Sequence, residues 1–244
     1  MSSDTPFTKE NLDAYLKELG KEFRKLNGTK TPAEIVLIGG AAILANYAFR
    51  EMTYDIDAII LASSAMKDAV NRVGDRLGLP VGWLNMDFKN TSSYTTKLLE
   101  VSVYYKTFSN VITVRTVAAE YLIAMKLISG RQYKNDLSDI VGILWEHQKS
   151  GDPISREAID RAIAVLYGED AKIPAVSRKT LDDTFAKGDF EKIYKEARQV
   201  EIESKKAILD FDKAYPGELK GENIDAIIER ARQKKARRKD DRDA

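Results

Sequence analysis

Residues 34–61, EIVLIGGAAILANYAFREMTYDIDAIIL, contain the pattern that decides the fold. Residues 34–38 are a short apolar run rich in β-branched side chains that stops at Gly39-Gly40, as buried strands do. Residues 41–50 favour a helix, and residues 55–61 are again typical of a strand. The order strand, Gly-Gly, helix, strand predicts a mixed α/β core around this segment.

The same segment carries a pair of carboxylates. Asp55 and Asp57 are two residues apart on a predicted strand, so their side chains project from one face. Such close carboxylates repel each other, and a divalent cation between them removes that repulsion; magnesium prefers oxygen ligands and often binds substrate phosphates as well. Gly39 and Gly40 let the backbone approach a triphosphate, and their amides lead into a helix N-terminus, which favours anions. The pattern predicts a magnesium site beside a phosphate-binding turn.

Composition excludes several other kinds of site. The 244 residues include no cysteine and one histidine, which rules out disulfides, thiolate zinc sites, a cysteine nucleophile and a multi-histidine metal site. Lys and Arg number 39 and Asp and Glu 38, so no global field draws the protein to nucleic acid or to a membrane. The apolar runs, of about five residues, are too short to span a bilayer. The N-terminus lacks a signal-peptide pattern, and we expect a cytoplasmic protein with no membrane partner.

Periodicity predicts the remaining elements. We expect helices at 8–26 and 63–77, strands at 97–106 and 110–116 joined by a turn at 108–110, and then helices alone. Those later helices are 118–129, 136–149, 155–167, 187–214 and one that begins near residue 222. The last segment, Arg232 to Ala244, has a net charge of +4 and is either a solvated helix end or an RNA-binding arm.

The Gly-Gly and Asp-x-Asp pattern resembles the core motif of the DNA polymerase β-type nucleotidyltransferase superfamily. It is most similar to the abortive-infection toxin (AbiEii-like) branch and its uncharacterised bacterial relatives. Trp83-Leu84-Asn85, residues 117–127 (VAAEYLIAMKL) and residues 131–140 (RQYKNDLSDI) resemble further elements of those relatives. The resemblance covers about residues 34–167. It implies a nucleotidyltransferase core (31–117) and a helical extension that completes the site (118–170). The periodicity adds an N-terminal helix (1–30) and a helical C-terminal region with the basic tail (171–244). We therefore expect an α/β (α+β) fold in which a small mixed sheet precedes a helical C-terminal domain.

The resemblance also implies roles for individual residues. Gly39 and Gly40 would hold the phosphates of a nucleoside triphosphate, and Asp55 and Asp57 would bind magnesium, with two ions expected. In the toxin branch a lysine on the helix after the sheet and an acid on the next helix complete the site. The matching positions are Lys126 and Asp139, with Asp136 as a second candidate for the acid. From the residues alone, Lys126 could instead extend to solvent, and either aspartate could simply cap its helix.

The third carboxylate of the superfamily has two candidates. Glu100, between Leu99 and Val101, fits the polar face of the strand predicted at 97–106, where it alternates with Ser102. Asp87 is the other option. Without one of them, both metals would depend on Asp55 and Asp57 alone.

These features predict a magnesium-dependent enzyme that moves NMP from an NTP to an acceptor hydroxyl. The resemblance favours RNA, with tRNA among the candidates, and a toxin or phage-defence role with a cognate antitoxin protein. Transfer to a small molecule such as an aminoglycoside uses the same fold. The alternative from another class is a weak or inactive member of the fold that docks a protein or RNA partner through residues 175–240.

Overall fold

A five-stranded sheet forms the N-terminal half of the chain. The computed structural model describes residues 6–129, 136–220, 223–224, 226–231 and 233. The strand order is β3-β2-β1-β5-β4. The strands are β1 (Ala33–Leu37), β2 (Ile56–Leu61), β3 (Leu84–Asn85), β4 (Ser102–Phe108) and β5 (Ile112–Val117).

The sheet is mixed, as the sequence predicts. The central strand β1 pairs antiparallel with β2 and parallel with β5, and the outer pairs are β2 with β3, parallel, and β4 with β5, antiparallel. The hairpin between β4 and β5 turns at Ser109 and Asn110, whose φ angles of 52° and 57° lie in the left-handed region that tight hairpins require. The turn predicted at 108–110 is confirmed.

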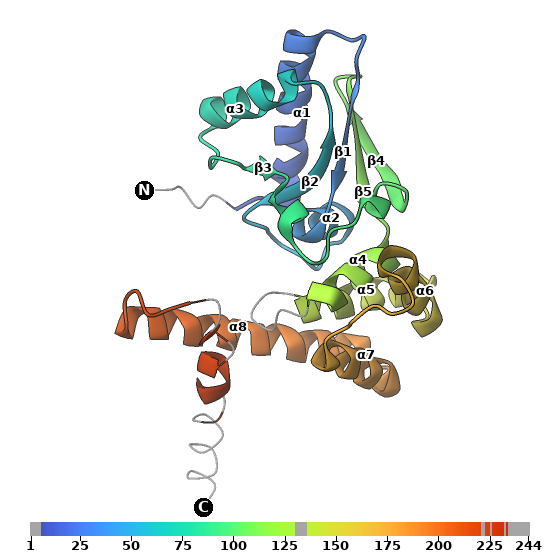
Figure 1. Cartoon of the computed structure of the whole chain (residues 1–244), viewed down its shortest axis with the longest axis vertical. Coiled ribbons are helices and arrows are strands. Elements are labelled where there is room, and N and C mark those ends of the chain that lie inside the picture. The colour runs from blue at the N-terminus through green and yellow to red at the C-terminus, as the bar shows by residue number, and fades with distance from the viewer. Residues whose placement is uncertain (1–5, 130–135, 221–222, 225, 232, 234–244) are drawn as a thin grey trace, which may run out of the picture.

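Helices cover one face of the sheet and its lower end. Helix α1 (Lys9–Asn27) packs against α3 (Ala65–Leu77), and the two lie on the same side of the strands in Figure 1. The short α2 (Gly39–Asn46) follows β1 directly. Two single 3₁₀ turns, Asp87–Asn90 and Thr96–Leu98, lie in the segment between β3 and β4.

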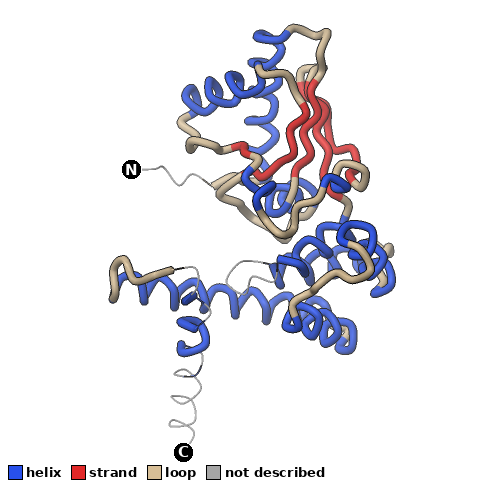
Figure 2. The backbone as a smooth tube through the Cα atoms, viewed as in Figure 1, coloured by secondary structure: helices blue, strands red, loops and turns tan. Residues whose placement is uncertain are grey.

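The rest of the described chain is helical. It comprises α4 (Ala119–Ser129), α5 (Asp136–Lys149), α6 (Arg156–Tyr167), α7 (Ala175–Lys187) and α8 (Phe190–Ala214). Figure 2 shows the strands gathered in one half of the molecule and the helices of the other half below them. Helix α8, the longest, packs along α5 and α7 and extends beneath the sheet (Figure 1). The predicted fold class, a small mixed sheet followed by a helical C-terminal part, is confirmed.

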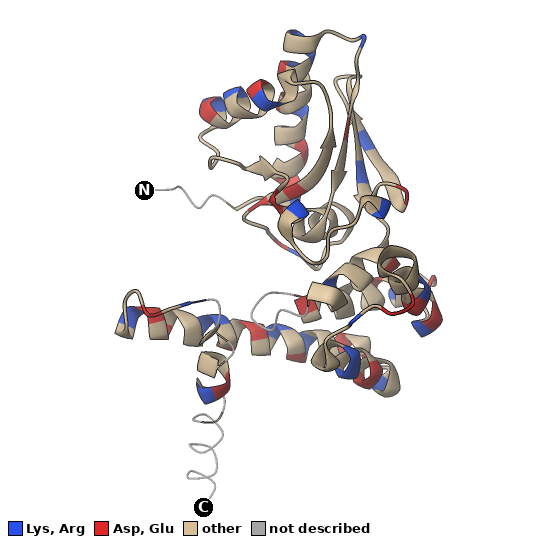
Figure 3. Ribbon diagram, in the orientation of Figure 1, with Lys and Arg blue, Asp and Glu red and all other residues tan. Residues whose placement is uncertain are grey.

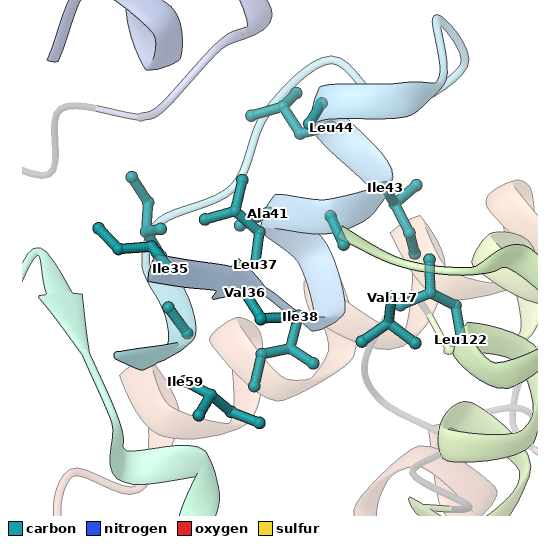
Figure 4. Close-up of a cluster of buried hydrophobic side chains, with 14 of the residues drawn as sticks. Ile35, Val36, Leu37, Ile38, Ala41, Ile43, Leu44, Ile59, Val117 and Leu122 are labelled. Atoms are coloured by element: carbon teal, nitrogen blue, oxygen red, sulfur yellow. The ribbon is translucent and has the colours of Figure 1, made fainter. Parts of the chain in front are cut away.

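One hydrophobic core connects the sheet to the helices that follow it. In Figure 4 the side chains of β1 meet those of α2 and, beyond Val117 at the end of β5, Leu122 of α4. Each of these apolar side chains is at most 2% exposed. This packing fixes α4, and with it Lys126, relative to β1 and the glycine turn that follows it.

Two expectations about elements are corrected. The helix predicted at 41–50 ends at Asn46, because Tyr47 and Phe49 leave the helix to pack against His147 and Tyr194. The strand predicted at 97–106 begins only at Ser102, because the preceding residues form a 3₁₀ turn that buries Leu98. The sequence predicts neither strand β3 nor helix α7.

Two of the sequence-based expectations concern residues that the structure does not describe. The basic tail, apart from Gln233, and residues 131–135 of the resemblance lie outside the described residues. Within the described ranges, no helix has both the length and the apolar character needed to span a bilayer.

Candidate active site

A cleft of about 900 Å³ lies between the core and helix α8. Its size is in the range of pockets that hold small-molecule ligands. The β1–α2 turn, the segment between α2 and β2, the segment after β3, and helices α4, α5 and α8 all contribute to its walls. Of the residues predicted for the site, the cleft is lined by Gly39, Gly40, Asp55, Asp57, Asp87, Lys126, Asp136 and Asp139.

The Asp-x-Asp pair lies next to the glycine turn. Asp57 is on β2 and Asp55 immediately precedes it, and the amide of Ile38 donates to the carbonyl of Asp57 (3.0 Å), which places Gly39 beside β2. A Cβ atom at Gly39 would lie 3.9 Å from Oδ2 of Asp57. Gly39 has a φ of +52°, a conformation that glycine adopts without steric cost. The turn therefore brings backbone amides at the start of α2 close to the carboxylates.

Helix α2 begins without a side-chain cap. Its N-cap residue is Ile38, whose side chain accepts no hydrogen bond. The first amides of a helix lack intrahelical acceptors and carry the positive end of the helix dipole. A phosphate group at this position would supply acceptors for them.

Gly40 lies directly against Arg50. A Cβ atom there would be 2.7 Å from Nη2 of Arg50 and 2.8 Å from Oγ1 of Thr53. The residue must therefore be glycine for the guanidinium to occupy its position. Arg50 is in the segment between α2 and β2 and is itself held by Asp139, whose two oxygens lie 2.7 and 2.6 Å from Nη1.

Lys126 joins the same buried network. Its Nζ donates to Oδ1 of Asp136 (2.8 Å) and lies 2.7 Å from Oδ2 of Asp139, and the lysine side chain is only 9% exposed. Burial disfavours the charged amine, but the carboxylates of Asp139 and Asp136 outweigh it and raise the pKa of Lys126. Lys126 is therefore charged at neutral pH, and it contacts carboxylates rather than extending to solvent.

Helix α8 forms the opposite wall of the cleft, through Tyr194, Arg198, Lys205, Ile208 and Leu209. Besides its packing against α5, it is joined to the core side by hydrogen bonds of Tyr194 and Glu201. The hydroxyl of Tyr194 donates to the carbonyl of Phe49 (3.0 Å). Glu201 accepts from the amide (3.0 Å) and the hydroxyl (2.6 Å) of Ser138 in the first turn of α5. Figure 3 shows basic and acidic residues interspersed along α8 and acidic residues at the lower end of the sheet above it.

Burial shifts the pKa values of several side chains of α8, and it raises the pKa of Tyr194. Glu201 is 3% exposed, and burial raises the pKa of its carboxyl despite the hydrogen bonds from Ser138. Burial, followed by the charge of Arg198, lowers the pKa of Lys205.

The two candidates for a third carboxylate lie in different places. Asp87 lines the cleft, in a turn where its amide donates to Oδ1 of Asn85 (2.8 Å), and Asn85 is the β3 residue paired with Asp57. Glu100 is exposed, lies in the turn before β4 and does not line the cleft. Its predicted position on a strand is wrong, because Leu98 and Leu99 anchor that turn in the core instead of alternating across a sheet.

The carboxylates of Asp55 and Asp57 suit a magnesium ion. Proteins commonly hold Mg²⁺ through one or two carboxylates, with water and substrate phosphates as the other ligands. Within the described ranges, no three His, Cys, Asp or Glu side chains are grouped so that they could hold a metal ion by themselves. A magnesium ion at this pair would therefore take its other oxygen ligands from water or from a bound molecule, and a phosphate at the glycine turn beside Asp57 would be close enough to supply them.

Sequence reasoning missed three basic residues that line the cleft, Arg50, Arg198 and Lys205. It also missed Glu201, which joins α8 to α5 through Ser138. Because the sequence places Arg50 at the end of a predicted helix, its contact with Gly40 could not be inferred. The α8 residues belong to a helix rich in charge, where spacing alone does not show which side chains face a distant strand. A weak signal did exist, because Arg198 and Lys205 are seven residues apart and so share a helix face.

Comparison with known protein families identifies the family to which the chain belongs. Residues 14–150, more than half of the chain, match a family model described as nucleotidyltransferase of unknown function (DUF6036). No curated protein and no solved structure matches the chain significantly. The chain belongs to this nucleotidyltransferase family, whose match includes the glycine turn, Asp55, Asp57, Lys126 and Asp139, and ends before α8.

Proposed function

We propose that the protein is a magnesium-dependent nucleotidyltransferase that moves NMP from an NTP to an acceptor hydroxyl. One observation carries the proposal: the glycine turn, the Asp-x-Asp pair and the buried lysine, which are far apart in the sequence, line a single cleft. The family match supports the same reaction class.

In the proposed reaction the acceptor hydroxyl oxygen bonds to the α-phosphorus of the NTP. The bond from that phosphorus to the pyrophosphate oxygen breaks, pyrophosphate leaves, and the hydroxyl proton passes to a carboxylate of the cleft. Asp55 and Asp57 would hold magnesium, which stabilises the charge on the phosphates and activates the hydroxyl. The amides at Gly39 and Gly40 would position the triphosphate, and Lys126, oriented by Asp136 and Asp139, would stabilise its developing charge.

The acceptor is the finer part of the proposal. We propose RNA, with tRNA to be tested first, and a toxin or phage-defence role controlled by an antitoxin protein, because the motifs resemble the AbiEii-like branch. The match to the broader family does not select this branch. An RNA acceptor would contact the exposed polar residues that line the cleft in the segment after β3, Thr91 and Ser92 among them.

The test is a transfer assay with purified protein, magnesium, each labelled NTP and total bacterial RNA. The matched variants are Asp57→Asn and Asp68→Asn, since Asp68 is an exposed aspartate of α3 outside the cleft. We expect label to enter RNA with the native protein and with Asp68→Asn, and to be lost with Asp57→Asn. Label that enters protein or a small molecule would show that the acceptor is not RNA. Absence of transfer, together with retained RNA or protein binding, would favour the inactive binding module.

A further inference from the structure

Arg50 is a charged residue of the cleft to which neither the motifs nor the family description assigns a role. It is in the segment between α2 and β2, and its side chain is 13% exposed. Such a buried guanidinium requires partners, because an unpaired charge is costly to bury. Its partners show which of its N–H groups are already used.

Both hydrogen bonds of Arg50 come from a single nitrogen. Nη1 donates to the two oxygens of Asp139, at 2.7 and 2.6 Å. Nε is buried and has no acceptor among the residues that the structure describes. Buried donors without acceptors are rare in native proteins, and they often mark a position that a ligand or water completes.

The remaining nitrogen, Nη2, lies against the glycine turn. It is the atom that a Cβ at Gly40 would meet at 2.7 Å, so the guanidinium lies next to the start of α2. Two features that favour anions therefore coincide there: the first amides of an uncapped helix and a guanidinium edge. The fork of an arginine matches phosphate oxygens closely.

Lys126 has less capacity to bind a phosphate than Arg50. Two of its three N–H groups face the carboxylates of Asp136 and Asp139. Asp139 contacts both cations, so it fixes the position of Arg50 relative to Lys126. The network thus orients a guanidinium toward the glycine turn and neutralises only one of its edges.

We propose that Arg50 binds the triphosphate of the incoming nucleotide at the Gly39-Gly40 turn, and that Asp139 positions it there. This inference rests on the proposed function and adds the residue that selects nucleoside triphosphates over monophosphates. Gly40 serves it by leaving space for the guanidinium. The ligand chemistry is a polyphosphate chain; a phosphodiester of RNA shares that chemistry, and the test separates the two.

The experiment measures binding by calorimetry in magnesium buffer, with Arg50→Lys as the variant and Arg72→Lys as the matched control. Arg72 is an exposed arginine of α3 that pairs with Glu22 and lies outside the cleft. The probes are the NTP that the native protein binds most tightly, its NMP, and a short RNA. Lysine keeps the charge but loses the fork, so we expect NTP affinity to fall about 10- to 100-fold, as for the loss of charge-assisted hydrogen bonds. NMP and RNA affinity should change less than about twofold, since neither probe carries the triphosphate on which these hydrogen bonds are made.

Thermal unfolding of each variant tests a purely structural role. If Arg50→Lys lowers NTP and NMP affinity equally while it lowers the melting temperature, Arg50 only supports the fold and the proposal is wrong. Unchanged NTP affinity, or a loss confined to RNA, also overturns it. If Arg50→Lys does not fold, Gly40→Ala, whose Cβ would displace the guanidinium, must produce the same selective loss of NTP binding. A native protein that binds no NTP would instead refute the proposed function itself, before any variant is compared.

Discussion

Replacement of Lys126 by methionine should destabilise the protein strongly. The change keeps the length and apolar stem of the side chain and removes a charge that contacts two carboxylates at 2.8 and 2.7 Å. All three side chains are at most 9% exposed, so water cannot replace the lost partner. Removal of one partner from a buried ion pair costs about 3–5 kcal/mol. For a chain of this size that corresponds to a fall in melting temperature of about 6–20 °C.

The assay is thermal unfolding followed by circular dichroism, with Lys195→Met as the control. Lys195 pairs with Glu191 at 2.6 Å on the surface of α8, where its side chain is 66% exposed. Exposed pairs of this kind contribute less than about 1 kcal/mol, so this variant should melt close to the native protein. The double variant Lys126→Met/Asp136→Asn should recover part of the loss, because Asp139 still binds Arg50 whereas Asp136 loses its lysine. If Lys126→Met melts together with the control, the buried network does not hold α4 to α5 and the reasoning is refuted.

Three further outcomes are expected. Asp55→Asn should reduce magnesium-dependent transfer at least about 100-fold, since even outer partners of metal ligands contribute 10- to 100-fold; transfer rates compared with Asp68→Asn check it. Asp87→Asn should slow transfer and Glu100→Gln should not, because only Asp87 lines the cleft; the reverse order would restore Glu100 as the third carboxylate. Glu201→Gln should change how stability varies with pH. Because burial raises the pKa of Glu201 above its ordinary value of 4.5, the native state holds that proton more tightly than the unfolded chain. The stability of the native protein relative to the variant should therefore be highest below pH 4.5 and fall as pH rises through the raised pKa, and urea unfolding at pH 4 and pH 8 measures it.

The sequence was sufficient to predict β1, β2 and the position of the acidic pair because those features are local. The β-branched run of β1 ends at two glycines, and Asp55 and Asp57 alternate with apolar residues across a strand buried on one face. Such patterns depend on neighbours within a few residues, where the strand period of two applies. The placement of all these groups in one cleft follows from the pairing of β1 with β2.

The segment from Tyr47 to Tyr54 could not be predicted because tertiary contacts override its helix propensity. The rings of Tyr47 and Phe49 pack on side chains from α5 and α8, far along the chain. A Cβ at Gly142 of α5 would lie 2.6 Å from the ring of Phe49, so that glycine makes room for the segment. No pattern within residues 41–50 indicates these contacts with α5 and α8. The same contacts place Arg50 against Gly40.

Glu100 illustrates a different failure. The sequence from Leu98 to Val103 alternates imperfectly, with two adjacent leucines before the glutamate. A strand would place Leu98 and Leu99 on opposite faces, but the core takes up both, Leu98 fully and Leu99 partly, by means of a 3₁₀ turn. Burial of apolar area outweighed strand propensity, and the glutamate was left exposed.

The net charge of the side chains that line the cleft limits which ligands the cleft can bind. Among the described residues, four basic and six acidic side chains line it, a net charge of −2. Arg50, Lys126, Asp136 and Asp139 neutralise one another within a buried network. The excess of negative charge therefore falls on the rest of the lining, where Asp55, Asp57 and Asp87, together with Glu51, outnumber the two cations of α8. A nucleoside triphosphate with several negative charges would be repelled from such a surface by itself. Divalent cations held by Asp55 and Asp57 would reverse the sign of that interaction, and under the proposals above the guanidinium and helix amides at the glycine turn would hold the end of the phosphate chain. If the glycine turn binds phosphate as proposed, the acidic pair is compatible with it in one cleft only when the ligand arrives with its metal.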